Sequence, residues 1–342
     1  MTSTRLGVSA KRSLFLVCAG GLATVAMACS GGGAPSQATQ APAAAGAQAP
    51  PAATTPRLKV AMITHQAPGD TFRDIVRKGA IAAADKDNIE LIYSNDPEAA
   101  KQSTLVQNAI DSKVNGIAIT LSKPDALAGA VQNATNAKIP VVAFNSGLDA
   151  WSQTGAMMYF GQDENLAGQT AGQRLTQEGL KHTLCVVQEQ GHVALEARCA
   201  GVKQGLSGGQ TENLYVTGTN MPSVKSTIAA KLQSDSSIDS VITLGAPFAL
   251  TAVQSVKDAS SKAKVYTFDT NAELVNAVKS GDVQWAIDQQ PYLQGYLAVD
   301  SLWLYLNNGD TIGGGKTVLT GPSFITKDNI EAIAQYASKG TR

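Results

Sequence analysis

The sequence predicts an α/β protein made of two similar doubly wound, Rossmann-like lobes. Short apolar runs alternate with segments of helical periodicity through most of the chain, and this alternation is typical of βαβ units. The runs are nearly continuous rather than alternating apolar and polar, as parallel strands that are covered on both faces require. The same series occurs twice, and 342 residues with 44% hydrophobic content suffice for two cores.

The first series of elements begins at Leu58. Apolar runs predict strands at 58–64, 89–94, 116–121 and 139–145. Apolar residues at helical spacing predict helices near 72–83, 100–110 and 126–134.

The second series follows the same order with helices leading. Helices are predicted at 165–179, 193–206, 221–233 and 248–259. Strands are predicted at 183–188, 213–218, 240–244 and 264–269.

The stretch from Val265 to Tyr305 contains two buried strands that end in polar residues. One ends at Asp269 and is followed by a short helix that stops at Gly281; the other ends in the sequence Asp-Gln-Gln-Pro before a long helix. Ligands of open α/β sheets lie outside the carboxyl ends of the strands. Phe-Asp, a glycine-terminated helix and then Gln-x-Pro-Tyr-x-x-Gly resembles the closing signature of the periplasmic monosaccharide-binding proteins of ABC importers, such as those for ribose, galactose and xylose.

The resemblance covers nearly everything after residue 56 and implies the type I periplasmic-binding-protein fold. That fold has two lobes, a hinge that the chain crosses three times and a ligand cleft between the lobes. Mapped onto this sequence, the resemblance implies an N-terminal lobe of 57–159 plus 290–317 and a C-terminal lobe of 160–289 plus 318–342.

Candidate ligand residues in the first lobe follow its strands. A sugar site needs planar groups that hydrogen-bond hydroxyls and an aromatic face for the ring. By the resemblance, Asp70 and Asn145 bind hydroxyls, Phe72 lies on the ring, and Thr120 is a further candidate. Arg73 stands where many members have a second aromatic residue. Its guanidinium is therefore expected to donate hydrogen bonds to a ligand hydroxyl or to Asp70. The alternative role of Asp70 is a helix N-cap.

The second lobe supplies the other candidates: Glu196, Asn220, Phe248, Asp269 and Gln289. Glu196 stands where ribose-binding relatives have an arginine. Phe248 is either a stacking partner or a core residue. Asp269 and Gln289 end the two strands described above, and the alternative for Asp269 is a helix cap.

The N-terminus predicts export. Residues 1–28 combine three basic residues with an apolar core too short to span a bilayer. Small residues before Cys29 resemble a lipobox, which implies acylation of Cys29; the alternative is an ordinary cleaved signal peptide. Residues 29–56 are uncharged and proline-rich up to the start of the folded body, which predicts a disordered tether. We therefore expect an extracytoplasmic protein, lipid-anchored to the outer face of the cytoplasmic membrane, or periplasmic.

Two cysteines remain outside the leader region, Cys185 and Cys199. In an oxidising compartment they predict a disulfide, and the alternative is two buried thiols. A loop this short would contribute about 3 kcal/mol when closed.

Other function classes find no support in the sequence. A G-x-S-x-G match at 205–209 follows a helix rather than joining a strand to a helix, so it lacks the context of a nucleophile elbow. We find no dinucleotide or phosphate-loop fingerprint, and we expect no metal, no cofactor and no enzymatic activity. The formal net charge of zero does not favour nucleic acid.

The resulting prediction is a monomeric solute-binding lipoprotein that captures an aldohexose or aldopentose, with glucose and xylose favoured, and delivers it to the permease of an ABC importer. Alternatives within the fold are a nucleoside, a polyol, autoinducer-2 or an amino acid. A sugar-responsive repressor would need a helix-turn-helix in place of the export signal, and a secreted hydrolase would hydrolyse a model glycoside.

Overall fold

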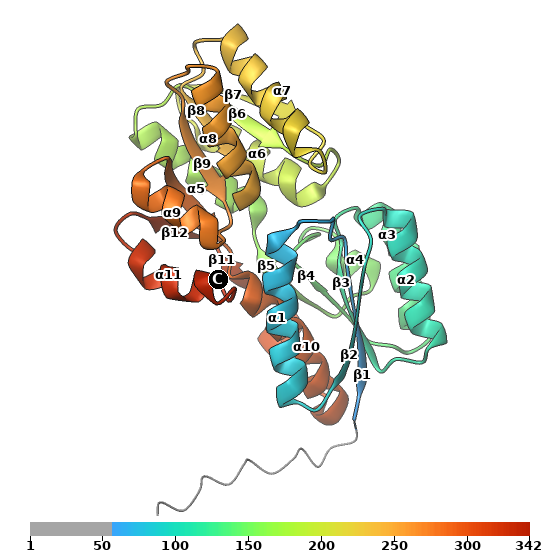
Figure 1. Cartoon of the computed structure of the whole chain (residues 1–342). Coiled ribbons are helices and arrows are strands. Elements are labelled where there is room, and N and C mark those ends of the chain that lie inside the picture. Colours follow the sequence, from blue (N-terminus) through green and yellow to red (C-terminus); the bar gives the residue numbers. More distant parts are fainter. Residues whose placement is uncertain (1–56) are drawn as a thin grey trace, which may run out of the picture. The chain divides into compact units, whose positions relative to one another are not determined.

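The computed structural model describes residues 57–342, which contain two six-stranded sheets (Figure 1). The expected signal peptide (1–28), tether (29–56) and acylated Cys29 lie outside the described residues. Within 57–342, no helix is long and apolar enough to cross a membrane.

The first sheet has the order β11-β5-β4-β3-β1-β2, with every neighbouring pair parallel. Its strands are β1 (Lys59–Thr64), β2 (Glu90–Asn95), β3 (Gly116–Thr120), β4 (Val141–Phe144), β5 (Met158–Gln162) and β11 (Thr317–Gly321). Its helices are α1 (Thr71–Lys86), α2 (Ala99–Asp111), α3 (Pro124–Asn136), α4 (Trp151–Thr154) and α10 (Pro291–Asn308).

The second sheet has the corresponding order β12-β10-β9-β8-β6-β7, and only β12 runs antiparallel. Its strands are β6 (His182–Val187), β7 (Gln210–Tyr215), β8 (Ser240–Thr243), β9 (Lys264–Phe268), β10 (Val283–Asp288) and β12 (Ser323–Thr326). Its helices are α5 (Glu164–Gln177), α6 (Val193–Gly205), α7 (Met221–Ser234), α8 (Ala246–Asp258), α9 (Ala272–Ser280) and α11 (Ile330–Ser338). The prediction of two similar doubly wound lobes is confirmed.

All strands and helices expected from the sequence are present, but several short elements were not predicted. These are α4, β5, a short 3-10 helix at Ile312–Gly314, β11, β12 and α11. β7 also begins and ends three residues earlier than predicted, because its register is fixed by parallel pairing with the whole of β6 rather than by its own few apolar residues.

The chain passes between the sheets after β5, after β10 and after β11. β5 and β11 extend to Gln162 and Gly321, so the lobe boundaries expected at 159 and 317 fall inside strands of the first sheet. The expected boundaries were carried over from the resemblance, and the pairing of β5 with β11 extends the first sheet beyond both of them.

In each lobe, one pair of helices packs backbone against backbone at glycines. A Cβ added at Gly79 of α1 would collide with the carbonyl of Tyr292 in α10, and one at Gly201 of α6 would collide with that of Asn165 in α5. Figure 1 shows α1 and α10 lying side by side. Gly205, which starts the G-x-S-x-G match, belongs to the same α5–α6 contact, so its role is packing.

Gly201→Ala is expected to destabilise the protein by about 1–3 kcal/mol or more, because backbone atoms on both helices leave no room for a methyl group. Gly129→Ala in α3 is the matched control: no atom lies within 4 Å of its Cβ position, so alanine there is expected to stabilise by about 0.5–1 kcal/mol. Urea unfolding measures both. Equal effects of the two substitutions would contradict the close helix contact.

Candidate functional site

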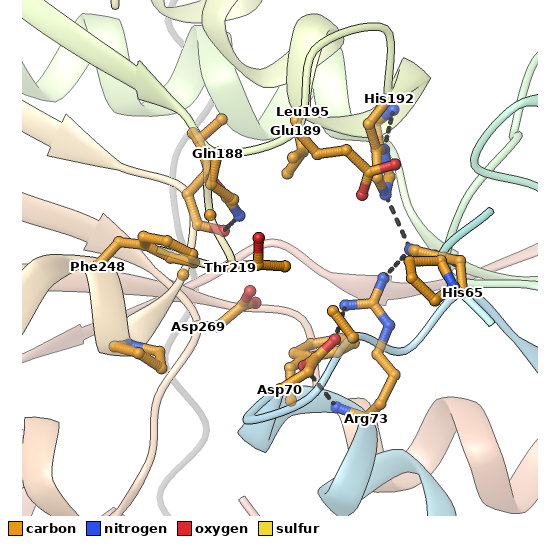
Figure 2. A pocket seen from close by; sticks show the side chains of 18 of the residues that line it. His65, Asp70, Arg73, Gln188, Glu189, His192, Leu195, Thr219, Phe248 and Asp269 are labelled. Carbon is orange, nitrogen blue, oxygen red and sulfur yellow. Dashed lines mark hydrogen bonds and ion pairs between the residues drawn. The ribbon is translucent and has the colours of Figure 1, made fainter. Parts of the chain in front are cut away.

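A cavity of about 650 Å³ lies between the two lobes, at the carboxyl ends of the parallel strands. Seven of the ten ligand residues predicted from the sequence line it: Asp70, Phe72, Arg73, Asn145, Phe248, Asp269 and Gln289. Figure 2 shows Phe248 and Asp269 across the pocket from His65 and Arg73.

Asn145 and Asp269 occupy equivalent points of the two lobes. Asn145 follows β4 and Asp269 follows β9, and both have a left-handed backbone, with φ of 63° and 64°. This conformation is uncommon outside glycine but is best tolerated by Asn and Asp. The backbone N–H of each donates to the neighbouring strand, to Phe160 and Ile287 respectively. The strand end thus holds a polar side chain at the cavity wall in each lobe.

A continuous series of hydrogen bonds connects the lobes through these residues. Arg73 Nη2 donates to Asn145 Oδ1 (3.1 Å), and Asn145 Nδ2 donates to Gln289 Oε1 (3.3 Å). Gln289 Nε2 then donates to Asp269 Oδ1 (2.8 Å). Gln294 of α10 supports the series from behind by accepting from Asn145 and donating to Gln289. Because the series includes the crossing after β10, it fixes the cavity wall where the chain passes between lobes.

Arg198 of α6 connects Asp269 to the second lobe. It makes a bidentate pair with Glu164 (2.6 and 3.0 Å), donates to the carbonyl of Leu244 (3.1 Å) and lies 3.5 Å from Asp269 Oδ2. Burial raises the pKa of Asp269 to about 6, although Arg198 and Gln289 favour its ionised form. Burial also opposes the charge on Arg198, but its two carboxylate partners outweigh this and raise its pKa.

Asp70 is the N-cap of α1, one of the two roles that the sequence left open, and it also lines the cavity. Its carboxylate caps α1 by accepting from Arg73 N (3.1 Å), and it lies 3.2 Å from Arg73 Nη1. Arg73 is therefore held by Asp70, Asn145 and His65, and it also lies over the ring of Phe72.

Of the two predicted aromatics, Phe72 is buried in the first lobe's core and Phe248 is partly exposed at the start of α8, and both reach the cavity.

Three predicted residues do not line the cavity. Thr120 is covered by His65, which bonds its hydroxyl. Glu196 turns away from the cavity and accepts from Tyr215 Oη and Gly191 N, because on α6 it is Leu195 and Arg198 that face inward. Asn220 caps α7, while its neighbour Thr219 lines the wall.

Sequence reasoning missed several cavity residues, above all His65 and His192. Each stands beside a strand end or helix start in the loops that supplied other candidates, and that position was the available signal. Gln188, Glu189 and Lys123 also line the cavity.

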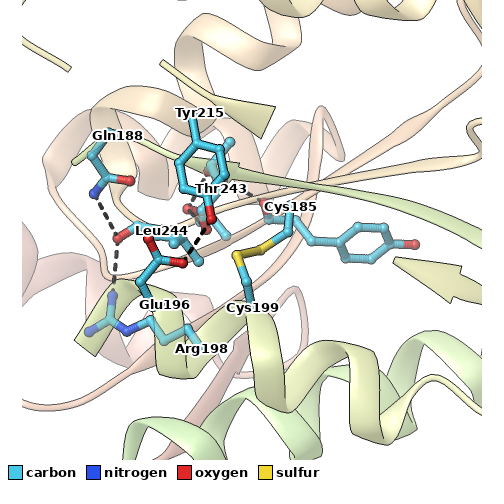
Figure 3. The surroundings of a disulfide bond; sticks show 10 residues. Cys185, Gln188, Glu196, Arg198, Cys199, Tyr215, Thr243 and Leu244 are labelled. Carbon is cyan, nitrogen blue, oxygen red and sulfur yellow. Dashed lines mark hydrogen bonds between the residues drawn. A yellow bond between two sulfur atoms is a disulfide. The ribbon is translucent and has the colours of Figure 1, made fainter. Parts of the chain in front are cut away.

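A disulfide joins Cys185 of β6 to Cys199 of α6, as the sequence predicted (Figure 3). Both cysteines are buried in the core of the second lobe. The bond fastens α6 to the sheet next to Arg198, and it therefore helps to fix the position of that guanidinium.

Among the described residues 57–342, one group of possible metal ligands lies away from the cavity, at His182, Glu212 and Asp235. The ammonium of Lys231 is 2.8 Å from Glu212 and 3.9 Å from Asp235, so these carboxylates already have a cationic partner. Nothing in this arrangement requires a metal.

The chain belongs to the periplasmic binding protein family, whose domain model matches residues 60–311. A xylose/arabinose-binding protein of Sulfolobus acidocaldarius is 28% identical over 254 residues, which are 68% of this chain and 63% of that protein. A ribose import binding protein of Haemophilus influenzae is 28% identical over 235 residues, 66% of this chain and 77% of that protein. These relatives are binding proteins of solutes, in agreement with the prediction that the chain is not an enzyme.

The fold also matches solved structures of the same kind. A carbohydrate transporter protein from Acidothermus cellulolyticus, solved in complex with myo-inositol, is 60% identical, with a TM-score of 0.83 over 84% of this chain and all of that one. A solute-binding protein from Agrobacterium vitis with bound D-fucose is 26% identical, with a TM-score of 0.74 over 82% of this chain and 99% of that one.

Proposed function

We propose that this protein captures a neutral, polyhydroxylated ring by closure of its two lobes and delivers it to an ABC importer. The observation that carries the proposal is the balanced charge of the cavity. Each Arg or Lys on its wall already has a carboxylate partner: Arg73 with Asp70, Lys123 with Glu189, and Arg198 with Glu164 and Asp269. An amino acid or a phosphate would need a cation that is free to pair with it.

The polar groups that remain suit hydroxyls. The amides of Asn145 and Gln289 can donate to and accept from vicinal hydroxyls, and the carboxylate of Asp269 can accept from them. Hydrogen bonds to a charged group contribute about 1.5–3 kcal/mol. Phe72 and Phe248 supply aromatic surface for ring C–H groups. A ligand that bonds groups on both lobes stabilises the closed state, so binding shifts the population of lobe arrangements.

Among such rings, we propose myo-inositol as the first candidate, ahead of the glucose and xylose that the sequence favoured. The support is the 60% identity to a protein solved with myo-inositol. A polyol was one of the alternatives that the sequence left open. An inositol ring carries a hydroxyl at every carbon, which suits the amide and carboxylate groups at Asn145, Gln289 and Asp269.

The delivery route and the anchoring are part of the same proposal. Acylation at Cys29 would hold the protein on the outer face of the membrane beside its permease, and partition of the purified protein with membranes tests the anchor. We also propose that the two lobes move about the three crossings, and that the boundaries expected at 159 and 317 shift to hinge points just beyond β5 and β11.

The test is a thermal-shift and calorimetric screen of the purified protein against myo-inositol, glucose, xylose, arabinose, ribose, nucleosides and amino acids. Ligand at 100 times its dissociation constant is expected to stabilise by about 2.7 kcal/mol, a shift of a few degrees. A shift with myo-inositol or one aldose supports the proposal. A shift only with a nucleoside or an amino acid would overturn the ligand class.

A further inference from the structure

Two histidines meet across the cleft. His65 follows β1 in the first lobe, His192 precedes α6 in the second, and both are almost fully buried. Their Nε2 atoms are 2.9 Å apart, and the rings meet edge to face (Figure 2). This is a direct contact between side chains of the two lobes, and nothing in the proposed ligand recognition has used it.

The partners of the two rings fix which nitrogens carry protons. Ala194 N–H is an obligatory donor and points at His192 Nδ1 (3.2 Å), so Nδ1 accepts and Nε2 carries the proton. The single lone pair of His65 Nε2 faces two donors, His192 Nε2–H and an N–H of Arg73 Nη2, which share it, so this nitrogen is unprotonated. His65 Nδ1–H then donates to Thr120 Oγ1 (2.7 Å). Every ring nitrogen has a partner of the right kind only when both rings are neutral.

Adding a proton to either ring breaks this arrangement. Protonation of His65 at Nε2 sets a donor against the donors of His192 and Arg73. Protonation of His192 at Nδ1 sets a donor against Ala194 N–H and ends the helix cap. A buried donor that faces another donor loses its hydrogen bond and keeps its desolvation penalty.

The charged surroundings act in the same direction. Burial lowers the pKa of both histidines well below its ordinary value, and Arg73 lowers both further. The other charged groups near the rings are Lys123 before α3 and Arg198 on α6, with the acids Asp70, Glu189, Glu164 and Asp269 as the partners of these cations. Since each acid is already paired with a cation, none is free to stabilise an imidazolium.

We propose that His65 and His192 are positioning residues of the ligand site, which join the lobes and hold Arg73 against Asn145 only while both rings are neutral, so that acid weakens ligand capture. The inference rests on the proposed function. Two further contacts lie along the same edge of the cleft: Val193 N donates to Ser122 O (3.1 Å), and Lys123 lies 3.3 Å from Glu189. The histidine pair is the part of this edge that changes charge near neutral pH.

The sign of the effect follows from linkage. Separation of the lobes exposes both rings to solvent and removes their mutual contact, so the pKa of each then lies closer to its ordinary value of about 6.5 than it does when the lobes are closed. Above about pH 6.5 both histidines are neutral before the lobes close, so closure releases no protons and its free energy does not depend on these rings. Below that pH, the histidines must release protons before the lobes can close. Affinity is expected to fall about tenfold per pH unit below that point for each histidine that must lose its proton.

The experiment is calorimetric titration of myo-inositol, or of the aldose that the screen identifies, between pH 8 and pH 5. The purified protein is compared with His192→Asn and with His182→Gln. Asparagine at 192 keeps an acceptor for the cap of α6 but cannot titrate or reach His65. It is expected to weaken binding at pH 7.5 and to flatten the pH profile. His182 lies away from the cavity, and its substitution is expected to leave the profile unchanged.

Asp269 titrates in the same range, so the variants must separate the two causes. A profile as steep in His192→Asn as in the unsubstituted protein would overturn the proposal and assign the acid sensitivity to Asp269. Absence of binding at pH 7.5 would instead be a failure of the proposed function. In that case small-angle X-ray scattering without ligand still tests the pair: the radius of gyration is expected to rise between pH 7.5 and 5.5 only when both histidines are present, and an unchanged radius would overturn the inference.

Discussion

Asp269→Asn is expected to weaken ligand binding by roughly ten- to a hundredfold without loss of stability. The carboxylate lies on the cavity wall, and a hydrogen bond to a charged group is worth about 1.5–3 kcal/mol to the complex. Asparagine has nearly the same shape, keeps an acceptor for Gln289 and leaves Arg198 paired with Glu164. Calorimetric titration gives the dissociation constant, and urea unfolding gives the free energy of unfolding.

The effect on stability has a defined pH dependence. The pKa of Asp269 is about 6 in the folded protein, above its ordinary value, so the folded state favours the protonated carboxyl. Burying the ionised form therefore costs stability above pH 6, on the order of 3 kcal/mol. The asparagine variant avoids this cost, so it is expected to equal or exceed the unsubstituted protein at pH 7.5, and the difference is expected to shrink as the pH falls below 6.

Asp125→Asn is the matched control for this substitution. Asp125 is exposed in the first turn of α3 and does not line the cavity, so binding is expected to change by less than about twofold. Unchanged affinity in Asp269→Asn, or a large loss of stability, would show that Asp269 is a structural residue rather than a ligand residue.

Arg198→Met is expected to lower the free energy of unfolding by about 3–5 kcal/mol. The substitution leaves Glu164 and Asp269 buried without their cation, and breaking one side of a buried ion pair costs far more than the pair contributes. Combining it with Glu164→Gln is expected to recover part of the loss, because one of the stranded charges is then removed. Urea unfolding of the single and double variants measures both.

The control is an exposed ion pair with a similar distance between its charged atoms: Lys225 Nζ lies 2.7 Å from Asp258 Oδ2. Lys225→Met is expected to change stability by less than about 0.5 kcal/mol, since solvent screens charges at the surface. A comparably small loss in Arg198→Met would mean that water or structural relaxation reaches Glu164 and Asp269.

Much of the site was predictable because strand ends can be located in the sequence. Apolar runs mark the strands, ligands lie at their carboxyl ends, and the first polar residue after a run is therefore placed near the cavity. Asn145 and Asp269 follow this rule, whereas after β10 it is the second polar residue, Gln289, that lines the cavity. Long amphipathic helices were predictable for the same reason, since their periodicity extends over several turns.

The remainder depended on geometry that a linear pattern does not contain. Glu196 and Arg198 are two residues apart on α6, and only the rotation of the helix against its sheet decides which faces the ligand. His65 and His192 are distant in sequence and meet through the arrangement of the lobes. β11 and β12 are short and flank a crossing, so their pairing partners define them more than their composition does.

The three crossings also determine the order in which the molecule can be completed during synthesis. The first sheet needs β11 for its edge and α10 against the glycine surface of α1, yet residues 291–321 leave the ribosome after nearly all of the second lobe. Until then the face of α1 around Val76 and Gly79 has no covering helix. The N-terminal lobe therefore cannot finish folding before the second lobe has been synthesised. It reaches its native form only when almost the entire polypeptide has been made.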